Sequence, residues 1–362
     1  MTKKTPEKGL YDFANFIGRF RPATNAHIDI IEHALRKAKF VHINVGSCFQ
    51  PRTERSPFYY DEVVSMIRGA FPAHEQERLL FSPVMDSPYN NIEWQTNVQK
   101  AMASAFERVG ATSNPSVALI GHRKDHGTGF YLDMFPQWDS IGIDNLHDNL
   151  SATHIRDYLF DNRGWDGKYR DKVPTSTNAF LRDFVTTEAF RELLAEVDYY
   201  RDYRKVHDEA ANLIASKLKF KAEIKHQTVD AMVVQSGHVL LIERRALPGR
   251  GLLALPGGFL DTEEWIEDAA FRELREETKI DIPNAVLRGG LVTSMLADYP
   301  HRSARGRVIS QVFLIKLKDG PLPKVKGRSD AKRAMWVPLG EIRPENMFED
   351  HAFIIRHLMN LL

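Results

Sequence analysis

The chain has 362 residues, of which 43% are hydrophobic and 27% charged, a length and composition typical of a globular protein with two domains. Its 49 basic and 48 acidic residues nearly cancel, so we expect no nucleic-acid partner, because the chain has no overall field to attract one. The single cysteine, Cys48, excludes an internal disulfide and indicates a reducing compartment. The start of the sequence has no apolar signal core, and no run of about 18 apolar residues occurs. We therefore expect no membrane association and a cytoplasmic location.

The first half of the chain alternates strand and helix patterns. Apolar runs at 13–18, 40–46 and 117–121 predict strands, and helical periodicity covers 28–38. This βαβ rhythm predicts an α/β fold with a doubly wound, Rossmann-like parallel sheet. Ligands of such folds bind at the carboxyl ends of the strands, so we expect functional residues directly after each strand.

The loop after the first strand, Gly18-Arg19-Phe20-Arg21-Pro22, leads into a helix start that carries Thr24 and His27. The free N–H groups at a helix start bind anions, and both side chains can point at a triphosphate there. A lone histidine at a helix start is more often a capping or surface residue. Here the loop is followed by further hydroxyl and cationic groups, with Arg55 after the second strand and Ser151-Ala152-Thr153-His154-Ile155-Arg156 much later.

These segments together resemble the nucleotidyltransferase superfamily over roughly residues 11–185, and the GRFxP opening is similar to the archaeal-type nicotinamide-mononucleotide (NMN) adenylyltransferases. The resemblance implies transfer of an adenylyl group from ATP to NMN, with NAD and pyrophosphate as products. It implies catalytic roles for Arg19, Thr24, His27 and Arg156, and contacts with ATP from Gly18, Phe20, Arg55, Ser151 and Thr153. The family's usual H-x-G-H motif reads Thr24-Asn25-Ala26-His27 here.

The acceptor pocket is expected around the stretch that holds Asp86, Tyr89 and Asn90, together with Trp94. By resemblance to the adenylyltransferases, an aromatic ring there stacks on the nicotinamide. The alternatives are an ordinary turn for the Asp-Ser-Pro-Tyr stretch and a place in the core for the tryptophan.

We expect three segments along the chain: a nucleotidyltransferase domain over 1–185, a helical connector over 186–224 and a second domain over 225–362. The connector has apolar residues at helical spacing and lacks the Gly/Ser bias of a flexible tether. The second domain opens with a predicted strand at 228–234, a turn at Ser236-Gly237 and a returning strand at 239–245. Further strands at 290–295 and 308–317 and a closing helix at 351–362 are predicted.

A run of regularly spaced residues, Gly258, Glu264, Arg272, Glu273, Glu276 and Glu277, lies in this second domain. A glycine-rich turn is followed by a helix that we expect to begin near Thr262. At about 100° per residue, the last three acids share an arc that overlaps the apolar stripe of the helix, so they are expected to face inward. Crowded, half-buried carboxylates repel one another unless a cation lies among them, and Mg²⁺ prefers oxygen ligands together with phosphate.

This run resembles the signature of the Nudix hydrolases, which split nucleoside diphosphates linked to another group. The resemblance implies an α/β/α sandwich in which Glu273, Glu276 and Glu277 hold Mg²⁺ (or Mn²⁺). Gly258, Glu264 and Arg272 would then support the turn and the helix. Lys279 stands where the family usually has glycine; if its backbone is left-handed, the lysine costs on the order of 1 kcal/mol.

The linkage to an adenylyltransferase, and the arginine-rich loop 298–307, resemble fused ADP-ribose pyrophosphatases. We therefore expect hydrolysis of ADP-ribose to AMP and ribose 5-phosphate. Glu349 and Asp350 are candidates for the catalytic base, although we expect a surface role for both.

The sequence thus predicts a bifunctional enzyme of NAD metabolism with ATP, NMN, NAD and ADP-ribose as its ligands, and it is compatible with a homo-oligomer. Two alternatives stay open. In one, the second domain binds ADP-ribose or NAD without cleaving it, which the intact acids argue against. In the other, the first domain is a nucleotidyltransferase for a different phosphorylated acceptor, as in the cytidylyltransferases, which Trp94 and the GRFxP opening argue against.

Overall fold

A computed structural model describes residues 10–111, 114–122, 130–143, 151–218 and 223–361. The chain forms two compact units, one made of Met1–Cys48 with Arg52–Leu194 and the other of Ala195–Leu362 with Phe49–Pro51. Helix α7 (Glu188–Leu218) contributes residues to both units and fills most of the expected connector. Within the described ranges, no helix combines the length and the apolar character needed to cross a membrane.

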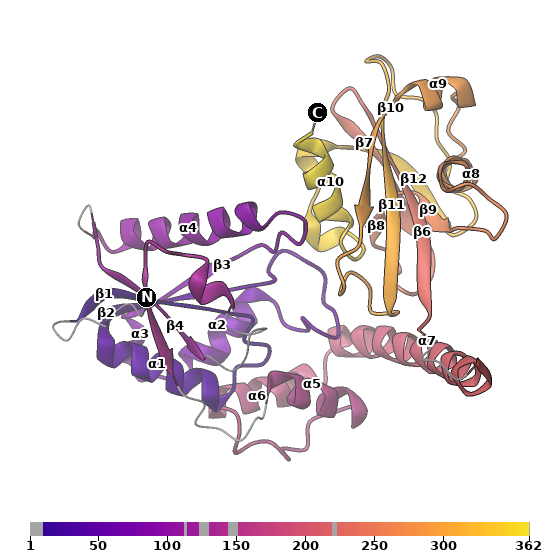
Figure 1. Cartoon of the computed structure of the whole chain (residues 1–362). Helices are drawn as coiled ribbons and strands as arrows, with labels where there is room; N and C mark the ends of the chain where they lie inside the picture. Colours follow the sequence, from indigo (N-terminus) through magenta and orange to yellow (C-terminus); the bar gives the residue numbers. More distant parts are fainter. Residues whose placement is uncertain (1–9, 112–113, 123–129, 144–150, 219–222, 362) are drawn as a thin grey trace. The chain divides into compact units, whose positions relative to one another are not determined.

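The first unit is a parallel sheet with helices on both faces (Figure 1). Its elements are β1 (Tyr11–Gly18), α1 (Asn25–Lys37), β2 (Ala38–Val45), α2 (Tyr60–Arg68), α3 (Ala73–Gln76), β3 (Leu79–Pro83), α4 (Asn91–Arg108), β4 (Val117–His122), the 3₁₀ helix η1 (Phe130–Asp133), β5 (Asp139–Ile143), α5 (Ala152–Asp161) and α6 (Thr175–Phe184). The strand order is β3-β2-β1-β4-β5, and all neighbours are parallel. The predicted doubly wound fold is confirmed.

The sheet of this unit is buried on both faces because its strands alternate side chains between two helical layers. Helix α4 packs on the face that carries Phe13 and Leu119, whereas α1 covers the opposite face (Figure 1). Strand β1 lies between β2 and β4, so the carboxyl ends of the three central strands meet at one edge.

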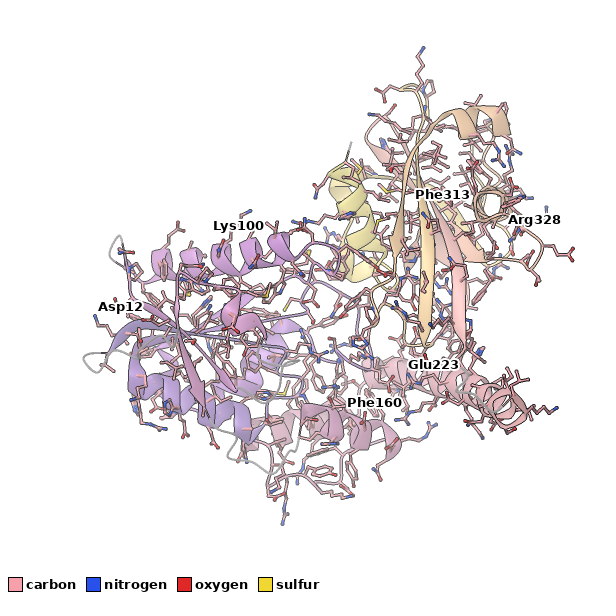
Figure 2. All side chains as sticks on the ribbon, viewed as in Figure 1. Asp12, Lys100, Phe160, Glu223, Phe313 and Arg328 are labelled. Carbon is pink, nitrogen blue, oxygen red and sulfur yellow. The ribbon has the colours of Figure 1, made fainter. Side chains whose placement is uncertain are left out.

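The second unit contains a mixed sheet flanked by helices. Its elements are β6 (Lys225–Gln235), β7 (His238–Arg244), β8 (Leu253–Ala254), β9 (Gly257–Phe259), α8 (Ile266–Thr278), α9 (Asn284–Gly289), β10 (Leu291–Ala297), β11 (Arg307–Lys316), β12 (Ala331–Pro338), η2 (Leu339–Glu341), η3 (Pro344–Asn346) and α10 (His351–Met359). The main strand order is β10-β11-β6-β7-β12, in which only β11 and β6 are parallel; β8 pairs with β7 and β9 with β6. Phe313 on β11 marks this sheet in Figure 2.

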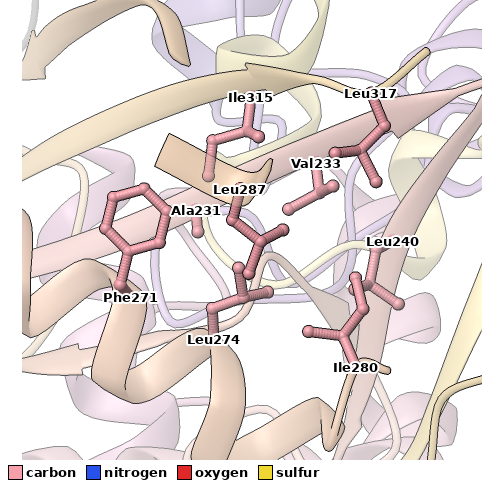
Figure 3. Close-up of a cluster of buried hydrophobic side chains, with 9 residues drawn as sticks. All are labelled: Ala231, Val233, Leu240, Phe271, Leu274, Ile280, Leu287, Ile315 and Leu317. Carbon is pink, nitrogen blue, oxygen red and sulfur yellow. The ribbon is translucent and has the colours of Figure 1, made fainter. Parts of the chain in front are cut away.

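Helices α8 and α10 lie on opposite sides of this sheet (Figure 1). Phe271 and Leu274 of α8 are buried against Ala231 and Val233 of β6 and against Ile315 of β11, as Figure 3 shows. Burial of these apolar side chains fixes the rotation of α8 about its axis. The predicted α/β/α sandwich is confirmed.

The turn between β6 and β7 follows the prediction. Ser236 and Gly237 both have positive φ, 46° and 73°, as a two-residue hairpin turn requires.

The start of the metal-site helix was predicted wrongly, because α8 begins at Ile266 rather than near Thr262. Residues 262–264 form a turn instead, since the Glu264 carboxylate binds Arg272 and does not cap a helix that starts earlier.

Candidate active sites

The loop after β1 is shaped by close packing of Gly18 against the ring of Phe20. A Cβ at Gly18 would lie 2.8 Å from the ring of Phe20, so only glycine fits there. Phe20 itself has φ 55°, and its buried ring packs edge-on against Phe16 and His27. Any contact of Phe20 with a phosphate therefore comes from its backbone.

Thr24 is the N-cap of α1, and His27 lies in the first turn. The backbone N–H of Thr24 donates to Nδ1 of His27 at 3.0 Å, and the Thr24 hydroxyl lies 3.0 Å from the same nitrogen. Because Nδ1 accepts this hydrogen bond, a neutral His27 carries its proton on Nε2. The capping contact thus sets the tautomer and gives the ring a donor.

Arg21, which the sequence analysis assigned no role, ties the loop after β1 to the loop after β2. Its guanidinium is buried and donates to the carbonyl oxygens of Phe58 and Gly46 at 2.7 and 2.6 Å. The carbonyl of Arg21 in turn accepts a 2.6 Å bond from Arg156 on α5. One residue therefore joins three segments that are far apart in the sequence.

Three arginines gather around this loop. Burial, together with the positive charges of Arg19 and Arg55, lowers the pKa of Arg156 to about 10. Arg156 also donates to the Thr153 hydroxyl at 3.0 Å, whereas Arg19 and Arg55 are exposed. Cations that repel one another in this way favour an anion among them.

The start of α5 repeats the arrangement of α1. Ser151 is the N-cap, and its backbone N–H donates to Nδ1 of His154 at 3.3 Å. His154 occupies the same helical position as His27, although the resemblance implied no role for it. The signal that identifies it is this shared spacing of hydroxyl and histidine.

The expected acceptor residues lie after β3. The Asp86 carboxylate accepts bonds from the hydroxyl and the backbone N–H of Ser47, which has φ 53°. Asn90 caps α4 by accepting a bond from the Glu93 backbone at 3.1 Å. Asp86 and Asn90 therefore hold loop geometry.

Trp94 is half-buried. It packs on Phe135 and on the cluster that contains Ile17, near the carboxyl end of β1. Trp94 thus lies at the edge of the sheet where ligands of this fold bind. Tyr89 is half-buried and precedes the N-cap of α4.

Arg272 is the hub of the second site. It makes a two-pronged pair with Glu264 at 2.8 and 2.9 Å, and it donates to Glu273 at 2.8 Å. A Cβ at Gly258 would lie 2.3 Å from the Glu273 carboxylate, so any larger residue there would displace that carboxylate. Arg272 and Glu264 thus join the turn to the helix, next to Gly258.

The three acids of α8 differ in burial. Glu277 is 4% exposed, and burial raises its pKa to about 8, although the Gly257 N–H donates to it at 3.0 Å. Burial also raises the pKa of Glu273. The expectation that all three face inward was wrong for Glu276, whose side chain is 50% exposed beside Arg272, because it lies at the border of the apolar stripe.

The donor set of this site suits a hard divalent cation. Glu273 and Glu277 are carboxylates whose pKa is raised mainly by burial, and the charge of Glu273 also raises the pKa of Glu277. A bound cation would offset that cost with oxygen ligands. Among the described residues, however, no three histidine, cysteine or acidic side chains are grouped as metal ligands, and Glu273 is paired with Arg272.

The surface role expected for Glu349 and Asp350 is wrong. Asp350 makes a two-pronged pair with Arg302, both bonds at 2.9 Å, and the two side chains are 5% and 2% exposed. The Glu349 side chain is 7% exposed and accepts a 2.6 Å bond from Ser303. Arg302 of the arginine-rich loop is therefore engaged in a buried ion pair with Asp350.

The two units match two different families of known proteins. The cytidylyltransferase-like family matches residues 15–125, and the NUDIX domain family matches residues 224–358. The nicotinamide/nicotinic acid mononucleotide adenylyltransferase of Acinetobacter baylyi is 32% identical over 183 residues, which are 51% of this chain and 92% of the relative. The ADP-ribose pyrophosphatase of Methanocaldococcus jannaschii is 39% identical over 133 residues, 36% of this chain and 71% of the relative.

A solved structure matches both units at once. It is a bifunctional NMN adenylyltransferase/ADP ribose pyrophosphatase from Francisella tularensis, complexed with AMP and a manganese ion. The identity is 33%, the TM-score is 0.83, and the match covers 97% of this chain and 99% of the other. Both resemblances predicted from the sequence are confirmed, and the chain belongs to the family of bifunctional NMN adenylyltransferase/ADP-ribose pyrophosphatases.

Proposed function

We propose that the chain joins ATP and NMN into NAD and pyrophosphate in its first unit, and that it hydrolyses ADP-ribose to AMP and ribose 5-phosphate in its second. The observation that carries this proposal is the presence of two opposite phosphate-handling arrangements in one chain. A cluster of cations surrounds helix starts in one unit, and desolvated acids lie on a helix in the other.

In the first unit, the triphosphate of ATP would lie among Arg19, Arg55 and Arg156 at the starts of α1 and α5. The phosphate of NMN attacks the α-phosphorus of ATP, and pyrophosphate leaves. Negative charge grows on the phosphoryl oxygens in this step, so cations and donors placed beforehand lower the barrier. His27 would donate from Nε2, because its Nδ1 is engaged by Thr24.

For the remaining phosphate contacts we propose the backbone of Gly18 and Phe20 and the hydroxyls of Ser151 and Thr153. The acceptor mononucleotide would lie beside Trp94 and Tyr89, at the edge where β1 ends. Asp86 and Asn90 would fix the loops around it through their bonds to Ser47 and to the α4 backbone.

In the second unit, Glu273, Glu276 and Glu277 would hold Mg²⁺, with Mn²⁺ as an alternative. The chemistry that a divalent cation supplies at such a site is neutralisation of pyrophosphate oxygens and activation of water. Arg272 and Glu264 keep α8 against the glycine turn, and Gly258 leaves room for the Glu273 carboxylate. Glu277 is held by the Gly257 N–H, so its orientation is set before any ligand binds.

The test is an assay of the purified full-length protein with each substrate alone. One reaction contains ATP, Mg²⁺ and either NMN or nicotinic acid mononucleotide, and another contains ADP-ribose and Mg²⁺ or Mn²⁺. Chromatography should show the dinucleotide in the first and AMP with ribose 5-phosphate in the second. ADP-ribose that binds but stays intact would support a sensor in place of a hydrolase, and failure with both mononucleotides would exclude the adenylyltransferase.

A further inference from the structure

Tyr200 of α7 carries a hydroxyl that lies among four charged side chains of the second unit. Burial raises the pKa of Tyr200, the carboxylates of Glu349 and Glu196 raise it further, and Arg305 and Arg244 lower it. Among the hydrogen bonds of the described residues, none involves this hydroxyl. A phenol hydroxyl that makes no hydrogen bond to the described protein can donate one to a ligand.

The two arginines approach the same aromatic ring. The Arg244 guanidinium lies 4.1 Å from the centre of the Phe348 ring, and that of Arg305 lies 6.0 Å from it. Arg305 is also 5.8 Å from the ring centre of Phe259, the last residue of the glycine turn strand β9. Phe348 therefore brings together an arginine from the end of β7 and an arginine from the loop before β11.

Each arginine is held in place by hydrogen bonds that leave some of its guanidinium N–H groups available to a ligand. Nε of Arg244 donates to the Pro248 carbonyl at 2.7 Å, and the next residue, Gly249, donates its N–H to Glu196 of α7 at 2.8 Å. A Cβ at Gly249 would lie 2.3 Å from the Phe348 ring, so this turn is tightly fitted. Glu196 thus holds the turn at Pro248 and Gly249, and this turn holds the guanidinium of Arg244.

Arg305 is held on the other side by Glu349. Its guanidinium lies 3.4 Å from the Glu349 carboxylate, which the Ser303 hydroxyl also binds. Glu349 has φ 45°, a left-handed backbone that is uncommon for residues other than glycine. Backbone strain of this kind gathers at ligand sites, where the surrounding structure holds it in place.

The two arginines repel each other, although the carboxylate of Glu349 lies beside them. Burial lowers the pKa of Arg244, and the nearby charge of Arg305 lowers it further. Glu277 acts electrostatically on Arg244 in the opposite direction, so Arg244 lies within electrostatic reach of this acid of α8. Two guanidinium groups and a hydroxyl beside a divalent-metal site match the oxygens of a diphosphate.

We propose that Arg244, Arg305 and the hydroxyl of Tyr200 bind one phosphate of the diphosphate substrate, while the other phosphate lies at the acids of α8. Glu196 is a positioning residue, which acts through Gly249 and Pro248 on Arg244. Tyr200 and Glu196 both precede residues 224–358, the part matched by the NUDIX family. The hydrolase site therefore extends into the connecting helix. This inference rests on the proposed hydrolysis of ADP-ribose.

The first test compares Tyr200→Phe with Tyr199→Phe in the full-length protein. Loss of one hydrogen bond to a charged phosphate should raise the KM for ADP-ribose about tenfold and leave kcat nearly unchanged. Tyr199→Phe removes a hydroxyl from the adjacent residue and should leave both constants as in the wild type. An unchanged KM in Tyr200→Phe, or an equal rise in Tyr199→Phe, would overturn the anion site.

The second test asks whether Glu196 acts by position. Glu196→Ala should raise KM about threefold to tenfold, and Glu196→Gln should restore it, because the amide oxygen can accept the same bond from Gly249. Glu192→Ala, on an exposed face of the same helix, is the control. If Glu196→Gln is as impaired as Glu196→Ala, the positioning role is wrong.

Calorimetry with ADP-ribose in the presence of EDTA separates this inference from the proposed function. Metal-free wild-type protein should bind ADP-ribose more tightly than Tyr200→Phe. If the metal-free wild type binds in this way but does not cleave ADP-ribose in the assay with metal, the proposed hydrolysis is wrong and the anion site stands. If the wild type cleaves and Tyr200→Phe matches it in both affinity and KM, the anion site is wrong and hydrolysis stands. Neither binding nor cleavage would reject both.

Discussion

The two proposed sites lie at opposite ends of their helices. In the first unit, Thr24 and Ser151 begin helices α1 and α5, so backbone N–H groups and the positive end of each helix dipole face the expected ligand. In the second, Glu276 and Glu277 lie in the last turn of α8, where the dipole is negative. The first site therefore favours an anion directly. The second favours a cation, which can then bind an anion.

This difference explains why the supporting residues differ. The first unit positions cations with neutral partners, as the carbonyl of Arg21 and the hydroxyl of Thr153 do for Arg156. The second unit positions acids with a cation, since Arg272 binds both Glu264 and Glu273. A change in one unit should therefore leave the reaction of the other intact.

The largest effect is expected for Glu277→Gln. This change removes the most deeply buried carboxylate of the proposed cation site and should lower ADP-ribose hydrolysis by on the order of 10³-fold, because the neutralisation of charge at a metal site is worth several kcal/mol. EDTA should have the same effect on the wild type. NAD synthesis by the variant should match the wild type, as measured by chromatography of both reactions.

Glu263→Gln is the matched control for that change, because Glu263 is an exposed acid in the turn before α8. It should hydrolyse ADP-ribose at the wild-type rate. Equal loss of both activities in Glu277→Gln would contradict the independence of the two sites.

His27→Gln should lower NAD synthesis by about 10²-fold, as is typical when one partner of the developing charge is removed. Glutamine can still accept the bond from the Thr24 backbone, as in a capping box, so α1 should begin normally. His27→Ala loses both roles and should also melt at a lower temperature. Steady-state kinetics and thermal melting separate the two effects, and wild-type kinetics in His27→Gln would remove the histidine from the site.

Gly258→Ala should lower hydrolysis by about 10-fold to 100-fold, the usual effect of disturbing the support of a metal ligand. The added methyl group would lie 2.3 Å from the Glu273 carboxylate and displace it. A titration of activity with Mn²⁺ should show weaker metal affinity. Gly289→Ala in α9, where a Cβ meets no atom within 4 Å, is the control. Unchanged metal affinity in Gly258→Ala would mean that Glu273 is not a ligand.

The fold could be predicted from the sequence where its signals are local. The apolar runs of β1 and β2 and the turn at Ser236-Gly237 each depend on neighbouring residues, and the structure has them. Strand β12 and the short strands β8 and β9 were not predicted. The two short ones hold two and three residues, and such segments pair only because β7 and β6 lie beside them.

The candidate sites, too, could be predicted only where their residues are close together in the sequence. The acids of α8 share one helix, so their spacing was visible in the sequence. The contacts of Arg21 with Gly46 and Phe58, or of Glu196 with Gly249, join residues far apart in the chain, and no local pattern marks them. A buried role for Glu349 was likewise hidden, because Ser303 and Arg305 approach it only in the folded unit.

The smallest effect is expected at the end of α8, for Lys279→Gly. Lys279 is exposed and has φ 46° and ψ 35°, the left-handed conformation considered from the sequence. Glycine removes the steric cost of that backbone but gains freedom in the unfolded chain, so the free energy of unfolding should rise by no more than about 1 kcal/mol. Thermal melting would measure this rise. Hydrolysis should stay unchanged, because the Lys279 N–H bond to the Arg275 carbonyl is kept and the acids of α8 do not move. A change in hydrolysis without a change in stability would show that the lysine side chain, rather than its backbone, takes part in the cation site.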